Sequence, residues 1–554
     1  MFYAHERPEA LNIVSEYSDD IPLLVAHMRR IGIPQTLDRH IPTRAYWGNL
    51  SVGWTAAIWL AHLLSCSDHK PNTVQQWALI HSETLRWCTG SSVTPVDFSI
   101  DRLYDVLIGL SHDERWQSIE TDLNKHMLQA WTLPANHVHL RRYEGRSWHI
   151  SPNGSFQISK AHPWRARTFL QSILVATLVP SSMPLVTWSF PDNHMQTRSC
   201  IALLERLSDV LPSQQSRFVG DALTAIELRG AIHIRNGEYL CLFPDALSDG
   251  GEPFADRFPA GVSNLFTERN GDHLSSGGIE WSTPVSVDID GATVTWNERR
   301  IVVRSPVQAH LLEEALRTRM AHAEAALRAL GQRKRGKRRL RSLDDLREAA
   351  RAILDSYQVH GLLHLDFAEQ IEERLVRRYR GRPTSVRIER EVHLDVSTDT
   401  DAFAQATRRL GWQMLGSNIP QPDLQADRAL SLATLPVSGF ERLQGRPLSL
   451  APHEVHTPEL EIGVVRLLAL GLRTLVLLET IARLQLIREG LLPAIDDERA
   501  VSRTTGERLL DAFRDITLTP GTNRSPGDIT PLSPLQQRVL YLLALSPEIY
   551  QATR

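Results

Sequence analysis

Apolar residues with helical spacing dominate the first quarter of the chain. The segments that begin at Ile21 and at Trp54 place apolar side chains three and four positions apart, and loops rich in Gly, Pro, Asn and Ser separate them. This pattern predicts an all-helical N-terminal domain over residues 1–133. Five tryptophans lie in it (Trp47, Trp54, Trp59, Trp77 and Trp87). Aromatic side chains mostly serve as apolar bulk, so we expect them in a core.

The periodicity changes from helix to strand after residue 133. Short runs rich in β-branched residues cover 137–140, 154–158 and 172–179, and turn residues separate them. A helical pattern over 197–211 follows, then a strand that ends at Phe218 and Val219, a helix from about Asp221, and a strand over 239–243. Strands followed by alternating strands and helices predict a mixed α/β sheet with helices packed on its faces.

Residues 246–410 have a different character, typical of an insertion. Polar and apolar residues alternate over 285–296 around Asp290 and Gly291, which predicts a β-hairpin that 301–304 can extend. Ser305 and Gln308 then have the spacing of a capping box, which predicts that Ser305 caps a helix with proline at its first position that runs to about Leu330. A further alternating strand covers 385–396.

The C-terminal part reads as helical over 464–486, 505–513 and 534–545. One stretch, from Ile462 to Ile487, is apolar enough to suggest a membrane span. Arg466 and Arg473 lie a heptad apart on one face of it, however, and Glu479 and Arg483 have the spacing of a helical ion pair. Four charges at such positions predict a helix packed inside a protein and no membrane span.

Composition narrows the class of protein without naming it. The chain has 554 residues, enough for several domains, and 61 Lys and Arg residues against 64 Asp and Glu leave a formal charge of −3. A basic surface for nucleic acid must therefore be local. The four cysteines lie far apart, which excludes the spacing of a structural zinc site and of a disulfide framework. The N-terminal residues lack the apolar core of a signal peptide, so we expect a cytoplasmic protein.

Two features carry candidate chemistry, and each has two interpretations. Asp221 follows a buried strand, where its carboxylate can either cap a helix or ligate a hard cation such as Mg²⁺; on local sequence we favour the cap. A basic run can either track DNA phosphates or form a solvated turn between helices. That run comprises Arg333, Lys334, Arg335, Lys337, Arg338 and Arg339.

Several segments together resemble the insertion-sequence transposases of family four, in the branch with a long helical N-terminal domain. The resemblance rests on Val219–Leu223, Tyr239–Leu242, Glu389–Val392, Arg409–Trp412 and Gly439–Leu450, and it covers nearly the whole chain. It implies an α/β fold with an RNase H-like core split by a β-containing insertion and flanked by helical regions. The implied divisions are 1–133 for DNA binding or dimerisation, 134–245 and 411–490 for the core, 246–410 for the insertion, and 491–554 for a helical tail.

The resemblance also implies three carboxylates that bind two divalent metals, which activate water or a 3′-hydroxyl for attack on a DNA phosphate. Asp221 matches the second acid. Arg141, followed by Arg142, stands at the first position, and Val437 stands at the third. The three other positions of the family's Tyr-Arg-Glu-Lys signature hold Leu430, Ala433 and Gln444. Glu144 and Glu441 lie near the lost acids, but a metal tolerates little displacement of a ligand, so we do not expect them to substitute.

We therefore predict a transposase-type protein that binds double-stranded DNA and has lost DNA cleavage and strand transfer. Arg141 and Arg142 favour a phosphate over a metal ion. The predicted partners are DNA, including transposon terminal inverted repeats, and a second copy in a homodimer, with a nucleoid-associated location in the cytoplasm and no membrane. No cofactor is expected if the site is inactive. The alternatives are an active DDE transposase that uses Mg²⁺ and substitute acids, and a decayed gene product.

Overall fold

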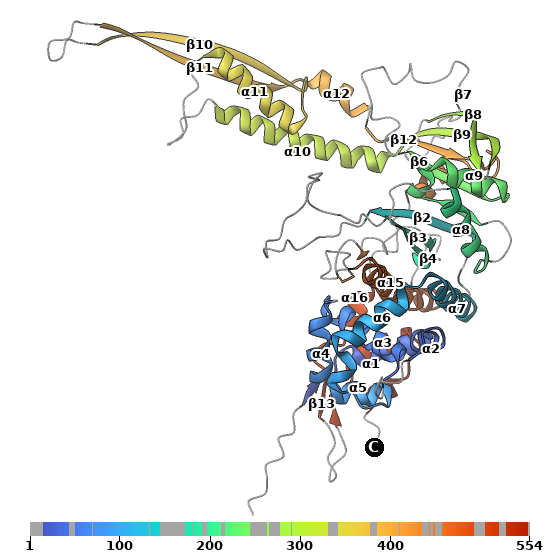
Figure 1. Cartoon of the computed structure of the whole chain (residues 1–554). Coiled ribbons are helices and arrows are strands. Elements are labelled where there is room, and N and C mark those ends of the chain that lie inside the picture. The colour runs from blue at the N-terminus through green and yellow to red at the C-terminus, as the bar shows by residue number, and fades with distance from the viewer. Residues whose placement is uncertain are drawn as a thin grey trace, which may run out of the picture.

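The computed structural model describes twenty stretches of the chain (Figure 1). They are residues 15–43, 50–68, 70–131, 133, 135–144, 172–179, 181–190, 197–211, 216–243, 263–264, 278–289, 291–330, 342–376, 385–408, 410–434, 442–443, 447–448, 457–491, 505–519 and 528–551. Helices and strands are both abundant, which confirms the α/β class.

The N-terminal part is helical, as its periodicity predicts. Its helices are α1 (Ile21–Arg30), α2 (Ile33–His40), α3 (Val52–Cys66), α4 (Pro71–Ile80), α5 (Ser82–Thr89), α6 (Ile100–Ser111) and α7 (Asp113–Trp131), with the short 3-10 helix η1 (Pro95–Phe98). Trp59 is buried in their core, and Trp54 and Trp77 pack against it. The preference for core packing over base stacking is confirmed for these three tryptophans.

The C-terminal helices complete this N-terminal unit. They are α15 (Pro458–Arg488), α16 (Gly506–Asp511), α17 (Pro534–Leu542) and the 3-10 helix η5 (Pro547–Tyr550). Strand β1 (Glu16–Tyr17) pairs with β13 (Thr517–Thr519), which pairs with β14 (Asp528–Ile529), so both ends of the chain share one small sheet. The segment that the sequence predicts as a C-terminal tail therefore packs against the first helices (Figure 1).

Helix α15 runs through the centre of the helical unit. Its Arg466 donates a hydrogen bond to the carbonyl of Leu110 (2.8 Å), and its Arg473 donates to Asn124 Oδ1 (2.5 Å). The expected pair between Glu479 and Arg483 is present at 3.8 Å. Across the described residues, no helix is long and apolar enough to cross a membrane.

A sheet of nine described strands forms the second unit. Its strand order is β4 (Met183–Phe190), β3 (Ser172–Leu178), β2 (His137–Glu144), β5 (Arg217–Val219), β6 (Glu238–Phe243), β12 (Trp412–Ser417), β9 (Ala292–Arg304), β8 (Gly278–Ile289) and β7 (Ser263–Asn264). Strand β5 is parallel to both of its neighbours, β2 and β6. All other neighbouring pairs in this sheet are antiparallel. Helices α8 (Thr197–Ser208) and α9 (Ile226–Ile234) connect β4, β5 and β6.

The predicted hairpin over 285–296 forms, but it belongs to this large sheet. The sequence places it in an insertion that starts at residue 246, whereas β9 pairs with β12, and β12 pairs on its other side with β6. Ile301, Val302 and Val303 of β9 are fully buried there. A hairpin signal is local, so it predicts the turn and the two strands without indicating which sheet they join.

Side chains of α7 cover the open edge of this sheet. Trp116 Nε1 donates to the carbonyl of Thr187 in β4 (3.1 Å), Glu120 Oε1 accepts from the Thr187 N–H (2.8 Å), and Asn124 Nδ2 donates to the carbonyl of Leu185 (2.6 Å). These three residues are four positions apart, so they line one face of the helix. The edge strand is thus protected, and the helical unit is joined to the sheet.

A third group of elements projects from the sheet (Figure 1). It contains α10 (Pro306–Leu330), α11 (Leu343–Tyr357), α12 (Thr400–Arg408) and a long hairpin of β10 (Leu363–Val376) and β11 (Ser385–Thr398). Its own apolar core includes Leu316, Met320 and Leu327 of α10. The expected cap at Ser305 is confirmed, because its Oγ accepts from the Gln308 N–H (3.2 Å).

Candidate functional site

The parallel pairing of β2 and β5 brings the sequence-predicted residues together at one end of the sheet. Val138 pairs with Phe218 and His139 with Val219. Strand β5 ends there, whereas β2 continues to Glu144. The chain after β5 therefore turns beside Arg141 and Arg142, and the 3-10 helix η2 (Asp221–Thr224) begins at that turn.

Asp221 contacts both arginines across the turn. Its Oδ2 lies 3.5 Å from Arg141 Nε, and its Oδ1 accepts a hydrogen bond from the backbone N–H of Arg142 (3.2 Å). The side chain of Asp221 is 47% exposed and that of Arg141 is 36% exposed. The N-cap interpretation is wrong, because Gly220 stands at the N-cap position of η2 and Ala225 at that of α9. Asp221 is the first residue of η2, and its carboxylate contacts the neighbouring strand β2.

Partial burial and the positive charge of Arg141 together shift the pKa values of Asp221 and His139 at this end of the sheet. Burial raises the pKa of Asp221, and the Arg142 N–H and the Arg141 guanidinium offset part of that rise. Burial also lowers the pKa of the neighbouring His139 to about 4, with the charge of Arg141 acting in the same direction. His139 is therefore neutral at pH 7, and the positive charge that faces the Asp221 carboxylate comes from the Arg141 guanidinium.

Gly220 allows β5 to approach β2 closely enough for these contacts. Its φ is +134°, and a Cβ at this position would lie 2.2 Å from the carbonyl oxygen of Leu140. Residues other than glycine rarely adopt this backbone conformation. Glycine is therefore required both by the backbone angle and by the space beside β2.

A buried polar network connects η2 to α9 and β9. Arg229 of α9 donates to the carbonyls of Leu223 (2.6 Å) and Thr224 (2.9 Å), the last two residues of η2. Its Nε lies 2.9 Å from Glu298 Oε1, and the Glu298 side chain is fully buried. Arg300 contacts the other oxygen of Glu298 at 2.5 Å. The turn that carries Asp221 is thus connected to β9 through Arg229 and Glu298, and Arg300 of β9 balances the second oxygen of Glu298.

Aromatic side chains complete this network. The Tyr239 hydroxyl donates to Glu298 Oε1 (2.6 Å), and Trp296 Nε1 donates to the Tyr239 oxygen (2.7 Å). Of these residues, only Tyr239 lies in a segment that carries the family resemblance, and none was predicted to form a buried network. The sequence does contain one signal for the network. Trp296, Glu298 and Arg300 alternate between the predicted hairpin (285–296) and its extension (301–304), so a continuous strand would place two opposite charges on the same face as a tryptophan.

The remaining sequence-predicted positions fall into two groups. Leu430 and Ala433 lie on α13 (Ala426–Ala433) and pack against a cluster that contains Val219 of β5. Other positions lie outside the described residues. They are Val437, Glu441, Gln444 and the basic run Arg333, Lys334, Arg335, Lys337, Arg338 and Arg339.

The donors that the structure describes beside Asp221 are too few for a two-metal centre. Within the part of the chain that the structure describes, no group of three or more His, Cys, Asp or Glu side chains could hold a metal ion. Two metals need several anionic ligands. Asp221 instead has Arg141 as its neighbour, and a guanidinium group neither loses its proton nor binds a metal.

No family model matches the chain, and no curated protein matches it. Among solved structures, it is similar to a piggyBac transposase in a synaptic complex with hairpin DNA, with 10% sequence identity and a TM-score of 0.22. The match covers 50% of this chain and 60% of that chain. A TM-score this low does not establish a shared fold.

Proposed function

We propose that this protein is a DNA-binding protein of the transposase type that has lost DNA cleavage and strand transfer. The observation that carries the proposal is the contact between Arg141 and Asp221, at 3.5 Å. The resemblance to transposases of insertion-sequence family four places a metal-binding carboxylate at each of these two positions. A fixed cation at one of them changes the chemistry that the site supports.

The strand order supports an RNase H-like core. The first three strands of the large sheet are antiparallel and lie in the order β4, β3, β2, and β5 and β6 then follow in parallel. Numbered within the sheet, this order is 3-2-1-4-5, a mixed sheet with helices α8 and α9 between its strands, which is compatible with the core that the resemblance implies. Asp221 follows the fourth of these strands directly, beside the first, where the family's second acid is expected.

Coulomb energies argue against metal catalysis beside Arg141. A unit charge and a dication about 4 Å apart repel by several kcal/mol at the effective dielectric constant of a protein surface. Loss of one acid also removes a ligand that the two metals share. Metal binding would therefore have to overcome repulsion with fewer ligands, and we propose that DNA binding by this protein needs no divalent cation.

A phosphate suits the same place better. The Arg141 guanidinium is planar, carries several N–H donors, and is 36% exposed at the end of the sheet. Arg142 follows it on β2. We propose that both arginines contact a DNA phosphate, with Asp221 holding the Arg141 side chain in position, and that the basic run Arg333–Arg339 supplies further phosphate contacts.

The proposal extends to how the chain is divided. The helical unit would hold and orient the DNA and provide a dimer contact. The pairing of β1 with β13 joins the N-terminal and C-terminal parts of the chain in this one unit. The projecting group, residues 306–408, would be the insertion. Mass measurement by light scattering, with and without DNA, tests for the homodimer.

Binding measurements at several salt concentrations test the DNA proposal. The probes are a duplex that carries the terminal inverted repeats flanking the gene and a scrambled duplex. Each phosphate contact contributes about 0.9 to the slope of log K against log salt, so replacing the six cations of the run by serine should lower the slope by up to about 5. Arg141→Ser and Arg142→Ser should lower it by about 1 each.

Arg235→Ser is the matched control, because Arg235 is exposed and pairs with Glu205 at the C-terminal end of α9, whereas η2 lies at the N-terminal end of that helix. Its slope should equal that of the unmodified protein. If the Arg141 and Arg142 variants also keep the full slope, the phosphate assignment at the sheet is wrong. If the run variant keeps it, the run is a solvated turn.

A further inference from the structure

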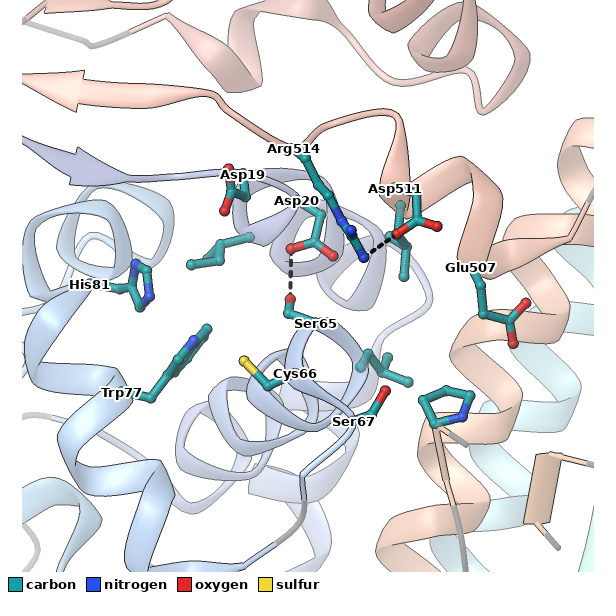
Figure 2. Close-up of a pocket in the computed structure, with 14 residues that line it drawn as sticks. Asp19, Asp20, Ser65, Cys66, Ser67, Trp77, His81, Glu507, Asp511 and Arg514 are labelled. Atoms are coloured by element: carbon teal, nitrogen blue, oxygen red, sulfur yellow. Dashed lines mark hydrogen bonds and ion pairs between the residues drawn. The ribbon is translucent and has the colours of Figure 1, made fainter. Parts of the chain in front are cut away.

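The helical unit contains a cavity between its N-terminal and C-terminal helices, and no residue of the nine-stranded sheet lines it. Its volume is about 420 Å³, within the range of small-molecule sites. It is lined by residues from the start of α1, the end of α3, α4 and α16, together with Arg514 and Pro447 (Figure 2). Nothing in the DNA-binding proposal uses this cavity.

The acidic groups of the cavity are not equally neutralised. Glu507 forms a two-point ion pair with Arg442 (2.6 and 2.8 Å), and Asp511 pairs with Arg514 (2.6 Å). Asp19 and Asp20 also line the cavity, and neither forms an ion pair with any described residue. Two adjacent carboxylates therefore leave the cavity with uncompensated negative charge.

Asp20 is the more deeply placed of the two carboxylates. It is 8% exposed, and its Oδ1 accepts a hydrogen bond from Ser65 Oγ (2.6 Å). Its other carboxylate oxygen has no partner in another described residue, and Figure 2 shows the side chain at the centre of the lining residues. Burial raises the pKa of Asp20 to about 6, and the Ser65 hydroxyl and the charge of Arg514 offset only part of this effect. A buried carboxylate with an open oxygen is stabilised by a bound cation.

Aromatic rings form the wall opposite α16. Trp77 and His81 lie with ring centroids 4.8 Å apart, and both line the cavity on the same side of Asp20 (Figure 2). Burial lowers the pKa of His81, which keeps this imidazole neutral. An indole ring attracts an ammonium group through its π face. The wall therefore adds to the attraction of the two carboxylates instead of opposing it.

We propose that this cavity binds a small organic cation through an ammonium group held between Asp20 and Trp77. The described residues include no cluster that could hold a metal ion, and the space is larger than a bare ion needs. Ser65, Leu64 and Ile21 beside the carboxylate can accommodate an aliphatic chain. The ammonium group belongs either to a free polyamine or to a lysine side chain of a partner.

Calorimetric titration of the full-length protein, without DNA, tests this assignment. The probes are spermidine, a short lysine-containing peptide, and 1,4-butanediol as a neutral analogue. We expect one molecule of spermidine or of peptide per chain and no binding of the diol. Binding of spermidine identifies a free amine as the ligand, and binding of the peptide alone identifies a lysine side chain. Absence of binding by both cations overturns the proposal.

Two variants and one control localise the binding. Asp20→Asn keeps an acceptor for Ser65 but removes the charge, so affinity should fall at least tenfold, and Trp77→Leu should weaken it about threefold through loss of the π face. The control is Asp345→Asn, which removes one of two adjacent exposed carboxylates at the start of α11. Equal affinity in Asp20→Asn and the control contradicts the assignment, and circular dichroism verifies that each variant is folded.

Discussion

Gly220 offers the sharpest test of the geometry at the end of the sheet. Gly220→Ala would force an alanine into a conformation with φ near +134° and ψ near 178°, where strain costs about 1–3 kcal/mol. The added Cβ would also lie 2.2 Å from the Leu140 carbonyl oxygen, in the middle of β2. Backbone in a central strand cannot move aside cheaply, so overpacking adds about 1–3 kcal/mol. We expect a total destabilisation of about 3 kcal/mol or more.

Gly291→Ala is the matched control for this variant. Gly291 also has a positive φ, +83°, but an added Cβ meets nothing within 4 Å. Its cost should therefore be about 1–2 kcal/mol, from the backbone conformation alone. Urea unfolding followed by circular dichroism measures both free energies. If Gly220→Ala costs no more than Gly291→Ala, then β5 does not approach β2 as described, and the contact between Arg141 and Asp221 loses its basis.

Two further predictions concern buried charge. The pKa of Asp20 is about 6 in the folded protein against an ordinary aspartate value of 3.8, so the folded state binds the proton more tightly and loses stability as the pH rises from about 4 through 6. Asp20→Asn removes that loss: urea unfolding should show a gain of up to about 3 kcal/mol at pH 7.5 and little change at pH 4, and equal gains at both pH values would contradict the assignment. Glu298→Gln leaves Arg229 and Arg300 without their buried carboxylate, so it should cost about 3–5 kcal/mol. Glu205→Gln, in an exposed pair, should cost less than about 1 kcal/mol in the same assay, and similar costs for the two would refute the role of the network.

Periodicity predicted the helices and strands better than it predicted which of them pair or pack together. The helices of the N-terminal part, the hairpin around Gly291 and the cap at Ser305 follow from local spacing and turn chemistry, and the structure contains all three. The pairing of β1 with β13 joins residues about five hundred positions apart. No local pattern encodes such a contact, so the C-terminal helices were predicted as a tail.

The candidate site shows the same limit at the level of single side chains. The resemblance of short motifs predicted that Arg141 and Asp221 belong to one site, and the parallel pairing of β2 with β5 brings these two residues into contact. The hydrogen bond from the Arg142 N–H depends on how β2 extends past β5, and local sequence favoured a helix cap instead. Glu298 was missed because a charge in an alternating strand normally faces solvent. Here Glu298 is fully buried and contacts Arg229 of α9, Tyr239 of β6 and Arg300 of its own strand.

Metal-dependent cleavage is the most direct test of the central claim. Purified protein would be incubated with Mg²⁺ or Mn²⁺ and a duplex that carries the terminal inverted repeats, and nicked or joined products would be resolved on a denaturing gel. We predict binding without any product, and the same result for Asp221→Ala. Nicking by the unmodified protein that Asp221→Ala abolishes would contradict this account and identify an active transposase with substitute acids.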